Sequence, residues 1–262
     1  MPQTPATISE PIKSRHRDVW DRLWRARAED RQDFEHLSAE AQSPRWNNLL
    51  KRLQSTFGTL KNLRSIEIGS GRGDFSALLA KLGVEVTLLD RSEIALMRAQ
   101  ERFDRLGLKA TLTQGDLLRP APKWSRRFDL AVSVGVVEHF RGWQRDQAIR
   151  SHFDVLKPGG LAVVAVPNAR CIPYRIWKMI QEVPRWWPYG LEIPYARREL
   201  LDRAQAAGFV DAETDVTGFW HAVGLLSSST TRINHPSWSA RRSRLDRRMG
   251  INLVLTARRP AN

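Results

Sequence analysis

The chain has 262 residues, 42% of them hydrophobic, and a formal net charge of +14, which suits one domain with a substantial core. Its single cysteine, Cys171, excludes a disulfide framework and cysteine-rich metal clusters, and no metal site is expected. No apolar run is long enough to span a bilayer, and residues 1–10 lack the apolar core of a signal peptide. We therefore expect a cytoplasmic protein.

The strong positive charge favours anionic neighbours such as nucleic acid or anionic lipid. The arginines are spread over every segment of the chain, however, and such a spread fits an arginine-rich genome equally well. The charge therefore leaves the choice of partner open.

The first sixty residues divide into a tail and a cap. Residues 1–15 are polar and contain three prolines, so we expect a disordered tail. Residues 16–60 have apolar side chains at helical spacing, for example Trp20, Leu23 and Trp24, and form a predicted N-terminal helical cap. The cap packs on the sheet edge, covers the ligand cleft, or does both.

From residue 61 onward, short apolar strands alternate with amphipathic helices. The predicted strands are 63–68, 84–89, 108–113, 128–134, 161–166, 209–216 and 251–257. This repetition predicts an α/β fold with a doubly wound, mostly parallel seven-stranded sheet and right-handed crossovers, over residues 61–262. We expect a turn at Lys157–Gly160 and two lid-like insertions, at about 168–195 and 218–250.

The most informative stretch joins the first strand to the helix that follows it. Glu67 lies near the end of the strand, and Gly69, Gly71 and Gly73 follow at alternate positions. Glycines let a ligand approach the backbone closely, and the start of the next helix offers unpaired N–H groups. Asp74 stands where a dinucleotide fingerprint has its last glycine, and Glu67 would repel a pyrophosphate. A nucleoside ligand that carries an ammonium group fits this turn better.

Two further acidic residues end predicted strands. Asp90 lies about twenty residues past the first glycine, where a carboxylate is expected to bond both ribose hydroxyls, and an ordinary turn residue is the alternative. Asp116 follows Gly115 after the third strand. Its carboxylate can accept from an adenine amine, or it can form an Asx turn.

In order and spacing, these motifs resemble the class I S-adenosylmethionine-dependent methyltransferases, most closely the small-molecule group that includes quinone-biosynthesis enzymes. The resemblance covers about residues 63–257, and it also rests on Val137-Glu138-His139-Phe140 after the fourth strand and Leu156–Gly160 before the fifth. It implies a Rossmann-like methyltransferase fold with S-adenosyl-L-methionine as cofactor.

The resemblance also implies a role for each matching position. Glu67 would hold the methionine amino group, and Gly69 and Gly71 would let the backbone pass close to the methionine part and the ribose. Asp90 would bond the ribose and Asp116 the adenine. The predicted cofactor-binding residues are Glu67, Gly69, Ser70, Gly71, Gly73, Asp90, Arg91, Asp116, Leu117 and Val134.

The resemblance further implies methyl transfer to a small or amphipathic acceptor, and we expect transfer at oxygen. His139 and the adjacent Glu138 follow the fourth strand at the cleft mouth and are the predicted catalytic residues, with His139 as base because histidine titrates near neutrality. A loop-capping role for His139 is the alternative. His221 and Tyr195 are weaker candidates for the base.

Three further hypotheses remain open. An RNA- or protein-directed methyltransferase is motivated by the charge, and a non-catalytic S-adenosylmethionine-binding module by the motifs alone. Peripheral contact with an anionic membrane is motivated by apolar and basic residues on opposite faces of an expected helix, and packing on the protein itself is the alternative. The apolar face of that helix consists of Trp238, Leu245 and Met249, and the basic face of Arg241, Arg244 and Arg248.

Overall fold

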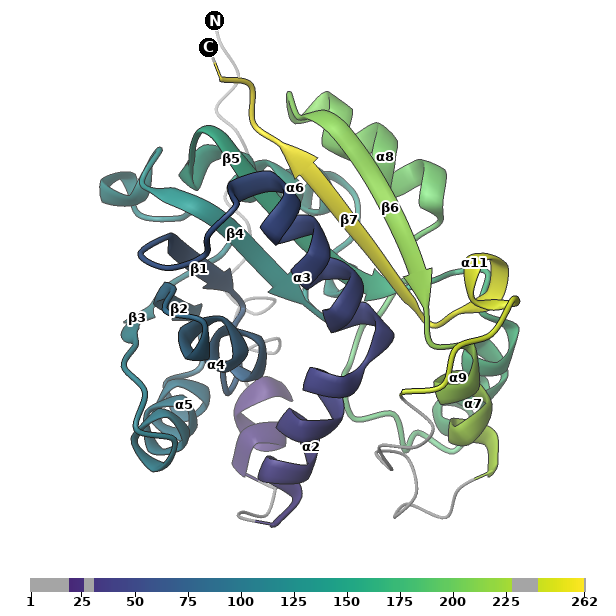
Figure 1. The fold of residues 1–262 in the computed structure, drawn as a ribbon. Helices are drawn as coiled ribbons and strands as arrows, with labels where there is room; N and C mark the ends of the chain where they lie inside the picture. The colour runs from purple at the N-terminus through teal and green to yellow at the C-terminus, as the bar shows by residue number, and fades with distance from the viewer. Residues whose placement is uncertain (1–18, 26–30, 228–239, 262) are drawn as a thin grey trace, which may run out of the picture.

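The computed structural model of the chain describes residues 19–25, 31–227 and 240–261 (Figure 1). Its seven strands form one sheet in the order β3-β2-β1-β4-β5-β7-β6. They are β1 (Arg64–Ile68), β2 (Glu85–Asp90), β3 (Thr111–Gln114), β4 (Phe128–Val134), β5 (Leu156–Pro167), β6 (Val210–Thr217) and β7 (Asn252–Arg258). β7 runs antiparallel to both β5 and β6, and the other pairs of neighbouring strands are parallel, which confirms the predicted mostly parallel arrangement.

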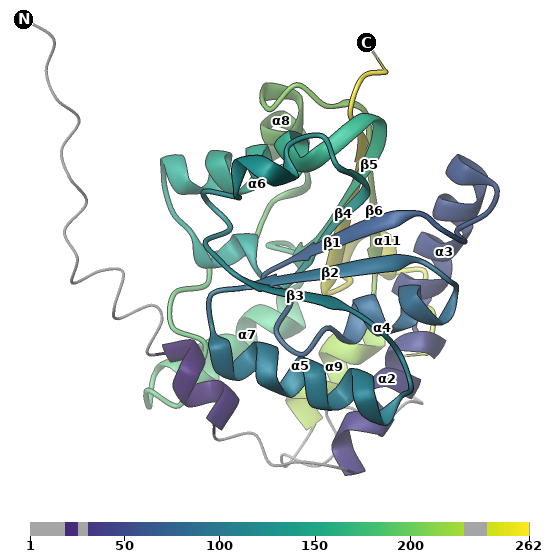
Figure 2. The same cartoon turned by 90° about the vertical axis from the view of Figure 1, so that its left-hand side faces the viewer.

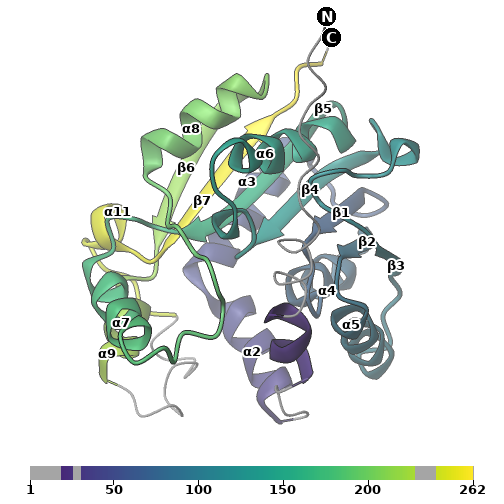
Figure 3. The ribbon, with the colours of Figure 1, turned by 180° about the vertical axis from the view of Figure 1, so that it is seen from behind.

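Helices cover both faces of the sheet (Figures 2 and 3). Helices α3, α4 and α5 lie on one face, and α6 and α8 lie on the other. The longer described helices are α2 (Arg31–Gln42), α3 (Pro44–Phe57), α4 (Asp74–Lys81), α5 (Glu93–Arg105), α6 (Trp143–Val155), α7 (Ile172–Glu182), α8 (Arg197–Ala206) and α9 (Phe219–Ser227). The shorter ones are η1 (Pro122–Trp124), η2 (Val137–His139) and α11 (Asp246–Met249).

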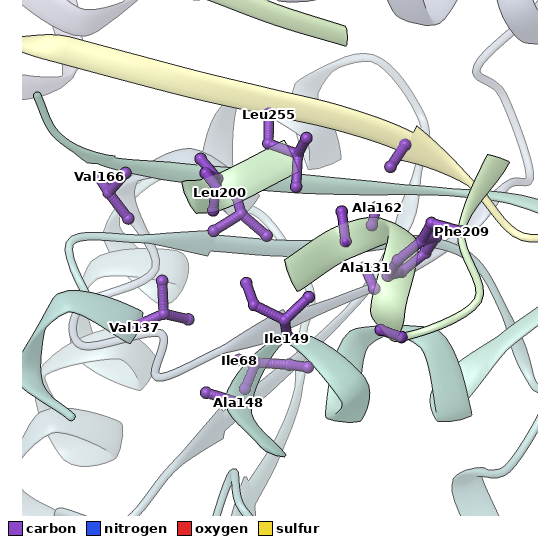
Figure 4. Packing of buried hydrophobic residues seen from close by; sticks show 14 of the residues in the cluster. Ile68, Ala131, Val137, Ala148, Ile149, Ala162, Val166, Leu200, Phe209 and Leu255 are labelled. Atoms are coloured by element: carbon purple, nitrogen blue, oxygen red, sulfur yellow. The ribbon is translucent and has the colours of Figure 1, made fainter. Parts of the chain in front are cut away.

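The core consists of two apolar layers, one on each side of the sheet. Ile68 and Leu255 from the strands pack with Ile149 of α6 and Leu200 of α8 (Figure 4). On the opposite face, a second cluster joins the sheet to α3, α4 and α5. Strands covered on both sides are apolar at almost every position, and the Ala, Val and Leu run of β4 has this character.

The N-terminal part of the chain is helical where it is described. Residues 19–25 form a helix, which we call the N-terminal helix, and the predicted tail lies outside the described residues. Between α2 and α3, the Ser43 hydroxyl accepts a hydrogen bond from the Trp46 N–H, and Pro44 opens α3. A serine cap followed by proline is a strong signal for a helix start, so α3 begins where the sequence breaks the preceding run.

The predicted turn at 157–160 is wrong, because these residues lie within β5. The Gly159 N–H donates to the carbonyl oxygen of Arg259 at 3.0 Å. The pairing of β4 with β5 shifts register between Phe128 and Leu130. This irregularity accommodates the glycine pair without ending the strand.

The helix expected around residues 238–249 is also wrong over most of its described length. Trp238 lies outside the described residues, residues 240–245 are not helical, and only α11 is. The Asp246 carboxylate accepts from the backbone N–H groups of Phe219 and Ser243, at 2.8 and 2.9 Å. Asp246 thereby ties this segment to the start of α9 instead of letting it continue as a helix. No helix in the described part of the chain is long and apolar enough to cross a bilayer.

Candidate active site

The glycine turn after β1 has a backbone conformation that other residues rarely adopt. The φ angles of Gly69, Gly71 and Gly73 are +70°, +52° and +69°. A Cβ on Gly69 would lie 2.6 Å from a Val136 side-chain carbon, and one on Gly71 would lie 2.7 Å from the Trp24 ring. The positive φ angles and the lack of room for a Cβ therefore both require glycine at these positions.

Glu67 is buried beside this turn. Its Oε2 accepts a hydrogen bond from the Ser76 N–H at 3.0 Å, at the start of α4. Burial raises the pKa of this carboxyl to about 8. The Ser70 hydroxyl is also buried, and its oxygen has no hydrogen-bond partner among the described residues. Both side chains line a cavity beside the glycine turn, and both can still form hydrogen bonds to a cationic or hydroxyl-bearing ligand.

Asp90 ends β2 and links two turns. One carboxylate oxygen accepts from the Gly71 N–H at 2.8 Å, and the other accepts from the Ser92 N–H at 2.9 Å. Burial raises the pKa of Asp90, and the nearby Asp21 carboxylate adds to this shift. Asp90 and Arg91 both line the cavity. The carboxylate therefore holds the glycine turn in shape while facing the space beside it.

Only part of the turn after β3 faces the cavity. Gly115 and Leu117 line the cavity, but Asp116 does not. The Asp116 Oδ1 accepts from the Leu118 N–H at 3.0 Å, which is the bond of an Asx turn. Gly73 also lies away from the cavity, because a Cβ there would meet Leu88 and Phe103 in the core. The structure brings all the other predicted site residues, Val134 included, to the cavity wall.

The cavity has a volume of about 550 Å³ and crosses the carboxyl ends of β1, β2 and β4. It continues from the glycine turn to η2 and the segment after α7. In open α/β sheets, ligands bind at this edge, where the strand order reverses. Here the order reverses between β1 and β4.

A cluster of carboxylates and an imidazole lies at the far end of the cavity. Glu138, His139 and Glu192 each present one potential ligand atom, and these atoms lie within 4.8 Å of one another. Glu138 is 1% exposed, its Oε2 has no hydrogen-bond partner within residues 19–25, 31–227 and 240–261, and burial raises its pKa to about 8. The His139 Nδ1 lies 2.6 Å from the Leu191 carbonyl oxygen, so it donates to that oxygen. The cluster can accept a proton or bind a divalent cation.

Aromatic side chains form the wall around this cluster. Trp187 packs edge-on against both Trp177 and Tyr189, with ring centroids 5.5 and 5.1 Å apart. Tyr174 donates a hydrogen bond to Glu192. The buried Trp187 Nε1 has no acceptor among the described residues. This end of the cavity therefore offers flat apolar surfaces with isolated polar atoms, which is typical of small-molecule sites.

The two weaker base candidates differ in position. His221 of α9 lines the cavity, and burial lowers its pKa to about 4, so its imidazole is neutral near pH 7. Tyr195 is fully buried away from the cavity lining, with the Arg145 guanidinium 3.5 Å from its ring centroid. Burial raises the pKa of Tyr195, and its hydroxyl lies 3.4 Å from the Val137 carbonyl oxygen. These contacts indicate a structural role for Tyr195.

Sequence reasoning missed several residues of this wall. Trp20 and Trp24 were expected in a cap without assigned contacts, and Glu192 carried no local signal. The aromatic and proline density of 168–195 was a usable signal for Trp187 and Tyr189. The fold and the cavity are typical of an α/β enzyme that binds a nucleotide-like ligand at the glycine turn, with room in the same cavity for a second substrate.

Comparisons with known proteins give the class of this enzyme. A family profile described as "Methyltransferase domain" matches residues 66–160. A ubiquinone biosynthesis O-methyltransferase from Methylobacterium sp. (strain 4-46) is 29% identical over 211 residues, 77% of this chain and 75% of that protein. An enzyme of the same name from Ruegeria pomeroyi is 33% identical over 131 residues, which is 49% of this chain and 51% of the relative.

A solved structure shows the same fold. Magnesium protoporphyrin IX methyltransferase from Synechocystis PCC 6803, with bound SAH, has a TM-score of 0.62 at 16% identity. The alignment covers 94% of this chain and 99% of that one. Together these findings show an S-adenosylmethionine-dependent methyltransferase with the class I fold, and S-adenosyl-L-methionine is its cofactor.

Proposed function

We propose that the enzyme transfers the methyl group to a hydroxyl oxygen of a small or amphipathic acceptor. The names of the two relatives support transfer at oxygen. The observation that carries the proposal is the buried Glu138 Oε2, which lines the cavity beside the aromatic wall and has no hydrogen-bond partner in the part of the chain that the structure describes. A hydroxyl on the acceptor can donate to this oxygen and then give up its proton.

The cofactor occupies the other end of the cavity in this proposal. Glu67 and the Ser70 hydroxyl bind the methionine part, because both retain hydrogen-bonding capacity there. Asp90 binds the ribose, and the backbone at Gly69 and Gly71 permits close approach. The adenine lies between Leu117 and Arg91, since Asp116 is engaged in its own turn. The bound cofactor supplies an electrophilic methyl group on a sulfonium.

The protein contributes orientation and a proton acceptor. The aromatic wall holds the acceptor so that its oxygen approaches the methyl carbon in line, and such alignment alone contributes on the order of 7–11 kcal/mol. As the oxygen–carbon bond forms, the bond between the methyl carbon and the sulfonium sulfur would break and S-adenosylhomocysteine would leave, while the O–H proton moves to Glu138. A carboxyl with a pKa of about 8 is a stronger base than an ordinary one and matches a working pH near neutrality. His139, fixed by Leu191, positions the η2 loop.

Labelled cofactor tests this proposal directly. The full chain is incubated with labelled S-adenosylmethionine and separate phenol, alcohol, amine and RNA acceptors, and the labelled position is assigned by mass spectrometry. Label on oxygen of a phenol or alcohol supports the proposal. Label found only on nitrogen or RNA contradicts it, and calorimetry with S-adenosylhomocysteine separately checks cofactor binding.

We further propose peripheral contact with anionic membranes through α7. Tyr174 and Lys178 turn toward the protein, whereas the opposite face of α7 is apolar and exposed. That face consists of Ile172, Ile176, Met179 and Val183, whose exposed fractions range from 40% to 79%. Arg175 and Arg185 are exposed nearby. An amphipathic acceptor could then reach the cavity from the lipid surface.

A further inference from the structure

Arg145 is a buried arginine in the first turn of α6, and it does not line the cavity. Its Nε donates to the Glu199 carboxylate of α8 at 3.1 Å, and its Nη1 donates to the Ile193 carbonyl oxygen at 3.0 Å. The guanidinium also lies over the Tyr195 ring, 3.5 Å from the ring centroid. A buried charge is costly unless it is paired and hydrogen-bonded, so these contacts allow the guanidinium to stay inside the protein.

The two chain segments that carry the acidic cluster meet beside this guanidinium. The Ile193 N–H donates to the backbone carbonyl oxygen of Glu138 at 2.9 Å. The His139 Nδ1 donates to the Leu191 carbonyl oxygen at 2.6 Å. Glu192 stands between these two bonded positions of its segment. The backbones of η2 and of residues 191–193 are therefore joined where Glu138 and Glu192 approach each other.

Arg145 spans the junction between these segments. Besides the bond to Ile193, its Nη1 lies 3.5 Å from the carbonyl oxygen of Phe140, which directly follows η2. The planar guanidinium reaches both carbonyl oxygens and the Glu199 carboxylate at once, whereas a lysine presents its donors from a single nitrogen. A buried ion pair is weak evidence for stability, because well-packed apolar side chains often replace one without loss. The contacts therefore point to a role in local geometry.

We propose that Arg145 is a positioning residue for methyl transfer, which fixes η2 against residues 191–195 and thereby holds Glu138 in place to accept the proton of the acceptor hydroxyl. The proposal rests on the proposed function, in which Glu138 is the base. Arg145 acts through the backbone of η2, since its own side chain does not line the cavity. A misplacement of about 1 Å at a reacting group lowers a rate by about 10²-fold, so a small shift of η2 has a large effect.

The substitution Arg145→Met removes the guanidinium and keeps an unbranched side chain. With labelled cofactor and the phenol that wild type methylates fastest, its single-turnover rate should fall about 10²-fold. The Kd of S-adenosylhomocysteine should change less than about twofold. Arg203→Met is the matched control, because Arg203 also donates to Glu199, at 3.1 Å, but its other ion pair is with Asp146. This control should stay within about twofold of the wild-type rate.

A double-mutant cycle shows whether Arg145 acts through Glu138. In the Glu138→Gln background, Arg145→Met should cost less than about twofold more, because the base that it positions is already absent. A further loss of about 10²-fold in that background would overturn the positioning role. A normal rate in Arg145→Met, alongside the expected loss in Glu138→Gln, would also overturn it. A normal rate in Glu138→Gln alone refutes the proposed base instead.

Hydrogen exchange gives a readout without acceptor or turnover. The Ile193 amide should exchange about tenfold faster in Arg145→Met than in wild type, while the amide of Ala131 in the centre of β4 keeps its wild-type rate. Unchanged exchange at Ile193, or the same acceleration at both amides, would contradict a local role. If Arg145→Met does not fold, the double variant with Glu199→Gln removes both charges of the pair and takes its place in each measurement.

Discussion

The substitution Glu138→Gln tests the proposed proton acceptor. It keeps the shape of the side chain but cannot take the proton of the acceptor hydroxyl. General-base catalysis contributes roughly 10²–10⁴-fold, so kcat should fall by a factor in this range. Cofactor affinity should change little, because Glu138 belongs to η2 and not to the glycine turn or the end of β2, which the proposal assigns to the cofactor.

The pH dependence gives a second, more specific expectation. With a pKa of about 8, Glu138 is ionised in about one tenth of molecules at pH 7 and in about nine tenths at pH 9. The wild-type rate constant for transfer should therefore rise about tenfold between these values, in a single-turnover assay with labelled cofactor. Glu138→Gln should remove this rise. A wild-type profile that is flat between pH 6.5 and 9, or a variant with normal kcat, would refute the assignment.

Glu192→Gln serves as the matched control for this experiment. The Glu192 charge contributes to the raised pKa of Glu138, so its removal should move the midpoint of the profile to lower pH without abolishing activity.

The pH dependence of folding stability gives an independent check that the pKa of Glu138 is raised and not lowered. The folded pKa of Glu138 is above its unfolded value, so its contribution is complete below about pH 4.5 and is lost as pH rises through about 8. The difference in stability between wild type and Glu138→Gln should therefore grow in favour of the variant from about pH 4.5 to about pH 8 and level off above that.

Three further expectations concern cofactor, metal and membrane. Gly71→Arg should abolish S-adenosylhomocysteine binding in calorimetry, because even a Cβ at this position meets the Trp24 ring; normal affinity would exclude this site. EDTA should leave kcat unchanged if Glu138 acts as base, whereas a loss restored by Mg²⁺ would assign the cluster to a cation. Ile176→Glu with Val183→Glu should weaken sedimentation with anionic vesicles at low salt while kcat on a soluble acceptor persists; equal sedimentation would rule out α7 as the contact.

Local signals in the sequence predicted much of the sheet and of the cofactor end. Apolar runs closed by glycine or a carboxylate, such as the run before Gly69 and the one that ends at Asp90, define β1 and β2 well. Their shared edge brings those residues together because parallel strands end on the same side of the sheet. Asp116 shows the limit of this reasoning, since its carboxylate bonds its own turn instead of facing the cavity.

The acceptor end was less accessible to prediction because it is assembled from distant segments. Glu192 reaches Glu138 across fifty-four positions of chain, and Trp20 meets His139 from the N-terminal helix. No spacing rule connects such pairs. Ile172 and Ile176 of α7 recur at helical spacing, but that periodicity gives no indication that this face points away from the protein.

The burial of Glu67 makes ligand capture a proton-coupled event. A carboxyl with a pKa of about 8 is mostly neutral at pH 7, yet an ammonium group held against it favours the ionised form. Each molecule of S-adenosylmethionine that docks should therefore expel nearly one hydrogen ion into the medium. Titration heats should vary with the ionisation enthalpy of the buffer, and binding should tighten as the solution is made more alkaline, up to about pH 8.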